Sequence, residues 1–561
     1  MKQLLIFIAA ATALWAVTGC EDIDLLAHVD GVDTESAGGG SDTSTTGLAE
    51  TDVGTDSETT DPVTNGTGEA VDSQSDMETE TVYAIPTPPI IGGWQWHICE
   101  AMPLIGFDKV KNALNPWPEL TPPMQLAGTS QFVTMYTESE LDYLFYTSVN
   151  SFPSNPAPTN YHIYSAQGDS VRALPLSDGR MAYVRRTVDD DYSEYQLELS
   201  DLKVDGVKIE IPLPGHDLDA LPLLIEDNGI IALFSQLDSA FTFGAGTARE
   251  ATLASDDGSP QNYLALYTLE GEFLKAQFVA LPFHISGVAI DRVSASVIAA
   301  GKMSHVTGEV SLGIVRMSMA SLFAFNGDPV VFTWESQNVA NSADALYSNS
   351  FGVDVVADEL GGFFLFTFRS GAAPVQIYDD DVLPRVMEAA TPSQIIAHFT
   401  AANENDFSEN YILDEDPVSQ GGWPLTRLIP AVTPYTPGLL FLAGTVSDAF
   451  LSSVQTAGTA IEPGVSSGTP VMAALNYSDA NAPPHFDVIR GMPGQIDIRG
   501  LSVTDPNMEI DGSTDVVISG LYKKDVQFAA PVLTPDGEAT TLAASDEGVV
   551  LLKVCDILAV E

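Results

Sequence analysis

The chain has 561 residues, 45% of them hydrophobic, which is enough for a large folded core. Its 77 acidic residues against 22 lysines and arginines give a formal net charge of −55. This balance argues against nucleic-acid binding, because a phosphate backbone needs basic contacts to displace its counterions. Three cysteines are too few for a disulfide-dense scaffold or a four-cysteine zinc site.

The N-terminus has the pattern of a secretory signal. Lys2 supplies a positive charge, and the apolar run over residues 4–17 is shorter than the roughly 20 residues that a spanning helix needs. The run ends in Val17-Thr18-Gly19-Cys20, which resembles the lipobox of bacterial lipoproteins. The resemblance implies that residues 1–19 are a signal peptide and that Cys20 is lipidated. An ordinary secretory peptide with a chance cysteine is the alternative.

The residue after the lipidated cysteine bears on location. In lipoprotein sorting an aspartate at that position can retain the product at the inner membrane, and this chain has Glu21 there. We therefore expect a bacterial envelope protein in the outer membrane, facing the periplasm or the cell surface. No later run is both long and apolar enough to span a bilayer, so Cys20 would be its contact with the membrane.

Residues 20–89 are predicted to be a disordered tether. Residues 21–82 contain 17 acidic side chains and no lysine or arginine, and Tyr83 is the first aromatic residue after Trp15. Such a segment cannot bury enough apolar surface to fold, and its charges extend it. The folded body is then residues 90–561, a single domain whose acidic excess indicates a solvated surface.

The body repeats a turn followed by a strongly apolar strand, and a second strand often follows. The first strand type recurs at 141–146, 178–184, 227–234, 296–301, 361–367, 437–444 and 515–520. The second type recurs at 195–199, 263–267, 312–317, 471–475 and 549–554. Helix signals are scarce. The sequence therefore predicts an all-β fold.

One of these repeats resembles the repeat of a known family. Residues 287–291, 297–301 and 313–317 together resemble the bacterial seven-bladed propeller repeat called SBBP, and the segment from Leu501 to Val554 is similar. The resemblance implies a β-propeller of seven blades and gives no common catalytic residues. A pair of β-sandwiches would also produce short strands and turns.

The remaining two cysteines bear on that choice. If Cys20 carries lipid, Cys99 and Cys555 are left near the two ends of the body. A propeller brings its termini together, whereas tandem sandwiches tend to separate theirs. We therefore expect a Cys99–Cys555 disulfide, formed outside the cytoplasm.

Catalytic patterns are weak. The eight histidines form no HExxH, and the GxSxG match at 464–468 lies in a Gly-, Ser- and Pro-rich loop without the helix that a nucleophile turn requires. The acidic runs 189–191 and 379–381 are typical of solvated turns, and the calcium-like segment 507–512 has Ile518 where the bidentate glutamate should stand. We expect no catalytic residue, no metal and no cofactor from these patterns.

Two functions fit the sequence. The first is a non-catalytic envelope lipoprotein whose propeller binds a protein or glycan partner. The second is an extracytoplasmic hydrolase whose site in the central channel is assembled from several blades and is invisible in linear spacing. The absence of a coherent catalytic pattern favours the first.

Overall fold

The computed structural model describes residues 93–559 with breaks, so Cys20 and the predicted tether lie outside the described residues. The chain divides into two units, Met1–Tyr83 and Ala84–Glu561, and all the described residues belong to the second. Breaks of five residues or more fall at 107–118, 150–162, 202–207, 215–221, 305–309, 325–329, 339–353, 370–374, 388–392, 413–427, 432–437, 508–513 and 523–547.

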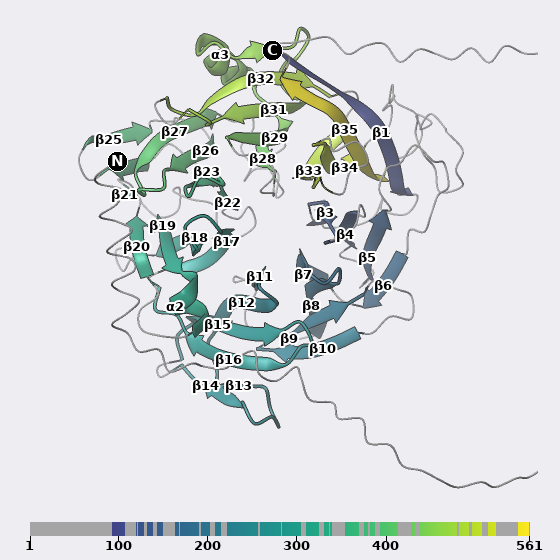
Figure 1. Ribbon diagram of the computed structural model, residues 1–561, viewed down its shortest axis with the longest axis vertical. Helices are drawn as coiled ribbons and strands as arrows, with labels where there is room; N and C mark the ends of the chain where they lie inside the picture. The colour runs from purple at the N-terminus through teal and green to yellow at the C-terminus, as the bar shows by residue number, and fades with distance from the viewer. Residues whose placement is uncertain are drawn as a thin grey trace, which may run out of the picture. The chain divides into compact units, whose positions relative to one another are not determined.

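The described body is an all-β propeller, as predicted (Figure 1). Six sheets, blades 1 to 6, are each built from one continuous stretch of chain. Their principal strands pair antiparallel and in sequence order, and one short strand of blade 6 pairs parallel. Short apolar strands bounded by tight turns favour this arrangement, because each strand needs only the next one along the chain as its partner. The alternative fold, a pair of β-sandwiches, is not the one that the structure shows.

The strands of the six blades follow in chain order. Blade 1 has β2 (Glu119–Leu120), β3 (Met124–Gln125), β4 (Phe132–Glu138), β5 (Tyr143–Val149) and β6 (Ile163–Gln167), and blade 2 has β7 (Asp169–Pro175), β8 (Met181–Asp189), β9 (Tyr192–Ser200) and β10 (Lys208–Leu213). Blade 3 has β11 (Leu223–Asp227), β12 (Ile230–Leu237), β15 (Gln261–Thr268) and β16 (Phe273–Phe278), and blade 4 has β17 (His284–Asp291), β18 (Ser296–Ser304), β19 (Val310–Ser318) and β20 (Val330–Glu335). Blade 5 has β22 (Asp354–Ala357), β23 (Phe363–Arg369), β26 (Ser393–Phe399) and β27 (Asn405–Ile412), and blade 6 has β28 (Leu428–Pro430), β29 (Leu439–Thr445), β30 (Ala460–Ile461), β31 (Pro470–Asn476) and β32 (His485–Gly491).

A further sheet, here called the closing sheet, joins the two ends of the body. It contains β33 (Ile496–Val503), β34 (Val516–Tyr522) and β35 (Gly548–Ala559), and β1 (Trp94–Gly106) pairs antiparallel with β35. The backbone N–H of Asp505, after β33, donates to the side-chain oxygen of Gln125 in blade 1 at 2.7 Å. The first and last described strands are thus paired with each other, and the closing sheet also contacts blade 1.

Smaller elements extend individual blades. The hairpin of β13 (Phe241–Phe243) and β14 (Ala251–Leu253) belongs to the loop of blade 3, and β21 (Gln337–Asn338), β24 (Val375–Asp379) and β25 (Val382–Met387) form a separate small sheet. The described helices are short: α2 (Met319–Ala324) and α3 (Asp448–Thr456). Among the described residues, none of the helices has the length and apolar character needed to cross a membrane.

The core lies between sheets rather than at one centre. One cluster of fully buried side chains joins blades 3 and 4 through residues such as Phe234 and Val315, and another joins blade 6 to the closing sheet through Phe441 and Ile518. Similar clusters join blades 1 and 2, 2 and 3, 4 and 5, and 5 and 6. Blades 2 to 6 are therefore buried on both faces, which explains mostly apolar strands such as Phe363–Arg369.

Amide side chains fasten successive blades at equivalent positions. Asn262, the second residue of β15, donates to the Phe283 carbonyl at 2.6 Å. Gln394, the second residue of β26, donates to the Leu428 carbonyl at 2.7 Å and accepts from the Leu428 N–H at 2.9 Å. Both amides are buried, and each satisfies the backbone at the entry to the next blade. The third strand of one blade thereby sets the position of the first strand of the next.

The repeats predicted from the sequence fall on equivalent strands of their sheets, with one exception. All five segments of the second type lie in the third strand of their sheets. Six of the seven segments of the first type lie in the second strand, but 141–146 overlaps β5, the third strand of blade 1. The second strand there is β4, whose sequence FVTMYTE carries polar residues inside the apolar run and therefore did not match the repeat.

Candidate functional site

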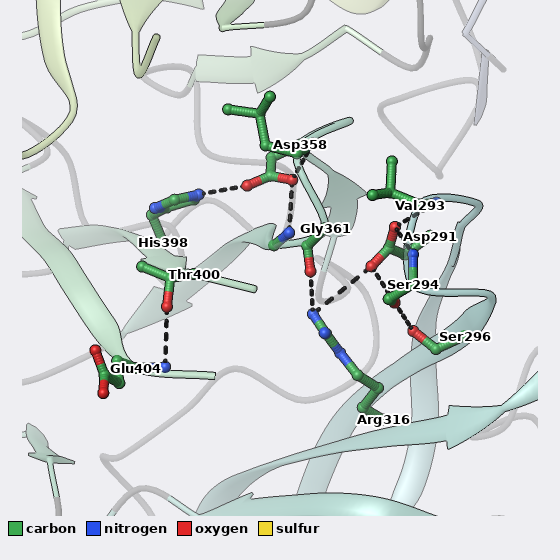
Figure 2. Close-up of polar contacts among 12 residues, drawn as sticks. Asp291, Val293, Ser294, Ser296, Arg316, Asp358, Gly361, His398, Thr400 and Glu404 are labelled. Atoms are coloured by element: carbon green, nitrogen blue, oxygen red, sulfur yellow. Dashed lines mark hydrogen bonds and ion pairs between the residues drawn. The ribbon is translucent and has the colours of Figure 1, made fainter. Parts of the chain in front are cut away.

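A connected set of polar contacts begins with two aspartates in turns of blades 4 and 5 (Figure 2). Asp291 ends β17, and its Oδ1 accepts the backbone N–H groups of Val293 at 3.0 Å and Ser294 at 3.2 Å. Asp358 follows β22, and its Oδ1 accepts from Leu360 at 2.8 Å and Gly362 at 2.7 Å. Aspartate favours such turns because its short carboxylate reaches the N–H groups just ahead of it.

The turn that follows Asp358 requires a glycine at position 362, because its backbone runs close against β26. A Cβ on Gly362 would collide with the carbonyl oxygen of Phe399 in β26 and with the Asp358 carboxylate. The backbone of the turn can therefore approach β26 closely, and this approach brings Asp358 within reach of a side chain on that strand.

That side chain is His398, which is 5% exposed. Its Nε2 lies 2.9 Å from Asp358 Oδ2, and its Nδ1 lies 2.6 Å from Asp406 Oδ1 in β27. Burial disfavours the protonated ring, but the hydrogen bonds and negative charges of Asp358 and Asp406 outweigh it, so the pKa of His398 is raised. An imidazolium satisfies both contacts, because each ring nitrogen then donates to a carboxylate.

Residues of the two neighbouring blades complete the set. Arg316 of β19 donates from Nη2 to the Gly361 carbonyl at 2.9 Å and lies 3.9 Å from Asp291 Oδ2. The hydroxyl of Tyr477, just after β31, donates to the Asp358 carbonyl at 2.8 Å. We call Asp291, Arg316, Asp358, His398, Asp406 and Tyr477 the inter-blade cluster. It joins blades 4, 5 and 6 at one turn.

The geometry of the inter-blade cluster is that of a clamp. Both nitrogens of His398 are engaged by carboxylates, so the ring has no lone pair to offer a metal or to accept a proton from a substrate. Asp358 accepts from two backbone N–H groups and from His398, which leaves it poorly placed as a general base. In the part of the chain that the structure describes, no group of three or more His, Cys, Asp or Glu side chains is arranged to hold a metal ion.

A second buried carboxylate lies in blade 2. Glu198 of β9 has no exposed surface, and the Tyr183 hydroxyl donates to its Oε2. Arg185 Nε lies 2.7 Å from one oxygen, and Lys208 Nζ lies 2.7 Å from the other. Three donors from β8 and β10 thus surround one acceptor from β9. This arrangement compensates a buried charge and fastens three strands of the blade together.

The contribution of His398 to the stability of the fold should depend on pH. Because the folded-state pKa of His398 is raised, its contribution to stability is complete below the ordinary histidine pKa of about 6.5 and is lost as pH rises through the folded-state value. We expect the free energy of unfolding to fall between those values, by at most about 1.4 kcal/mol per pH unit. Urea unfolding of the wild type and of His398→Gln from pH 6 to 9 measures it, and equal slopes would contradict the assignment.

The sequence-predicted residues are distributed as follows. Cys20 lies outside the described residues. Cys99 lies in β1, and Cys555 lies in β35 opposite His97 and is partly buried. The segment 464–468 forms a turn that leads from β30 to β31, so it joins strand to strand and is not a nucleophile turn. There the Ser466 N–H donates to Thr469 Oγ1 at 3.1 Å.

The inter-blade cluster is a feature that sequence reasoning missed. His398 and Asp406 are eight residues apart, but Asp358 is forty residues before His398 and Tyr477 is far beyond both. No linear motif spans these separations. The only local signal was an aspartate at the end of an apolar strand, which reads equally well as an ordinary turn.

No family model matches the chain, and no curated protein matches it. Among solved structures, a neuraminidase-like protein of A/flat-faced bat/Peru aligns at 9% identity and a TM-score of 0.32, over 84% of this chain and 96% of that one. A GH43_1 enzyme from Xanthomonas citri aligns at 13% identity and a TM-score of 0.23, over 58% and 93%. The phage phi92 endosialidase aligns at 9% identity and a TM-score of 0.29, over 78% and 68%.

Proposed function

We propose that the chain is a lipid-anchored protein of the bacterial envelope that displays a β-propeller for binding a protein or glycan partner, without catalysing a reaction. The observation that carries the proposal is Val17-Thr18-Gly19-Cys20 at the end of a short apolar run, followed by an acidic segment and then by the propeller. An anchor, a spacer and a rigid binding body form a coherent display protein. The outer membrane is the proposed location, because Glu21 departs from the inner-membrane signal.

Two buried carboxylates of the described body are poorly placed for catalysis. The buried carboxylates of Asp358 and Glu198 are both occupied by donors of neighbouring strands. General acid–base catalysis needs a group that can exchange a proton with a substrate, and a group saturated inside the fold cannot do so. These clusters therefore fit a scaffold that holds blades in place.

We propose that the closing sheet is the seventh blade and that a Cys99–Cys555 disulfide secures it. The pairing of β1 with β35 supports this, because Ile98 faces Val554 and His97 faces Cys555, which brings the Cys99 backbone close to Cys555. Both ends of the body would then be held by one covalent bond. Peptide mapping without reduction should recover the two cysteines as one linked peptide pair, whereas two free thiols would refute the bond.

The anchor can be tested by one substitution. Cys20→Ser should abolish lipidation and leave an unprocessed precursor, because the thiol is the atom to which the lipid would be attached. Mass spectrometry of the purified chain measures both effects, and the lipid mass should vanish only in this variant. Cys99→Ser is the matched control, since it also removes one cysteine but leaves the anchor. Equal masses of lipid on the wild type and Cys20→Ser would contradict the proposal.

Binding without turnover is tested with the full chain and a panel of calcium, polysaccharide fragments and peptidoglycan fragments. A ligand at about one hundred times its Kd should add about 2.7 kcal/mol to the free energy of unfolding, seen as a higher Tm. Chromatography of the same mixtures should recover each glycan intact. Release of a smaller product would instead favour the extracytoplasmic hydrolase.

A further inference from the structure

The described residues contain three exposed large hydrophobic side chains, and two of them lie in neighbouring turns. Val293, in the β17–β18 turn, is 59% exposed, and Leu360, in the β22–β23 turn, is 49% exposed. Val331, on the outer strand β20, is 63% exposed. A single exposed valine is ordinary, but two apolar side chains on adjacent turns form a patch that water does not favour.

The two turns meet at Gly361. The position that a Cβ would take on this glycine lies 3.5 Å from Val293 Cγ1 and 3.3 Å from the Cβ of Ala401, which is exposed in the β26–β27 turn. The glycine has a φ of +95°, which a larger residue rarely adopts. Gly361 itself is buried, and the exposed side chains around it are Val293, Leu360 and Ala401, which we call the turn patch.

The turn patch is held rigidly from below. Asp291 and Asp358 fix the backbone on either side of Val293 and Leu360, and Arg316 ties the Gly361 carbonyl to blade 4 (Figure 2). The exposure of these side chains is thus enforced by the fold. A surface that is ordered before binding loses less conformational entropy when a partner arrives.

Two glutamates and one arginine lie in the turns that carry the turn patch. Glu359 and Glu404 flank it, and Arg292 is the exposed base beside it. Burial raises the pKa of Glu359; Arg292 opposes this, while the charges of Asp291 and Asp358 reinforce it. Asp291 and Asp358 already have Arg316 and His398 as partners. Glu359 and Glu404 are therefore the carboxylates that a cation from a partner would meet, which makes the patch complementary to positive charge.

We propose that the turn patch is the docking surface for a protein partner, contacted through a basic segment that carries a large apolar side chain. The inference rests on the proposed binding function and selects the protein over the glycan. The three patch side chains offer aliphatic contact area and no aromatic ring on which a sugar could stack. A basic residue beside the apolar one meets Glu359 and Glu404, while the apolar side chain covers Val293 and Leu360.

The test uses fluorescence anisotropy of a labelled peptide of alternating lysine and leucine, titrated with the full chain in neutral detergent, with detergent alone as the blank. Peptides of alternating lysine and serine, and of glutamate and leucine, separate charge from apolar contact. Val293→Ser and Leu360→Ser should each weaken binding of the lysine–leucine peptide by about tenfold. Val331→Ser, which removes an equally exposed valine elsewhere, should leave the affinity within about twofold.

The outcomes separate this inference from the function on which it rests. Equal weakening by Val331→Ser, or equal binding of the lysine–serine peptide, would overturn the turn patch as the docking surface. Undiminished binding in both patch variants would also overturn it, while leaving a binding propeller intact. If no peptide binds and the ligand panel produces no shift in Tm, the proposed function fails together with the inference. The Tm of each variant should equal that of the wild type.

Discussion

His398→Ala should lower the free energy of unfolding by about 3–5 kcal/mol at pH 6. The substitution removes the imidazolium and leaves the carboxylate of Asp358, which is 2% exposed, without its positive partner. Because breaking a buried pair strands a charge, the loss exceeds that of an ordinary hydrogen bond. Urea unfolding followed by tryptophan fluorescence measures the change, and a loss below about 1 kcal/mol would contradict the clamp.

The two carboxylates around His398 provide an internal control. Asp406 has a side chain that is 35% exposed, so Asp406→Asn should cost much less than Asp358→Asn. The double variant His398→Ala with Asp358→Asn should be less destabilised than the sum of the two single variants, because the second change removes the stranded charge. Strict additivity would show that the two side chains do not act as a pair.

Glu198→Gln should destabilise blade 2 by a similar amount, about 3–5 kcal/mol. The glutamine keeps the shape but removes the charge that Arg185 and Lys208 share, at a residue with no exposed surface. Calorimetric unfolding of the full chain measures the loss.

Glu210→Gln is the matched control for that prediction. Glu210 lies 3.2 Å from the same Lys208, but its side chain is 48% exposed. An exposed ion pair contributes about 1 kcal/mol or less, so this variant should remain close to the wild type. Equal losses of unfolding free energy at Glu198 and Glu210 would mean that burial does not strengthen the ion pairs of Glu198.

The sequence predicts the propeller from features that are local. An Asp- or Gly-rich turn followed by an apolar strand, as at 227–234, needs only a few neighbouring residues to be read. The strand of blade 1 that escaped prediction, β4, has threonines and a glutamate among its apolar residues, and its position became evident only from its pairing with β5. Strand pairing is a property of the folded sheet, so pattern alone could not assign it.

The inter-blade cluster could not be predicted for a related reason. Its members come from β17, β19, β26, β27 and the turns after β22 and β31, and their meeting depends on how one blade packs on the next. A motif such as HExxH places its residues within a few positions of one another, whereas the partners of His398 are 8 and 40 residues away. Residue types alone could indicate a turn at Asp358, but only the fold places a histidine beneath it.

The most direct test of the display-protein account is the intact mass of the chain recovered from the membrane fraction of a bacterial host that processes lipoproteins. The account predicts a polypeptide that begins at Cys20 and carries the additional mass of lipid on that residue. It also predicts that detergent is needed to extract it. A chain that begins at another residue, with an unmodified Cys20 or without it, would contradict the anchor and with it the proposed display function.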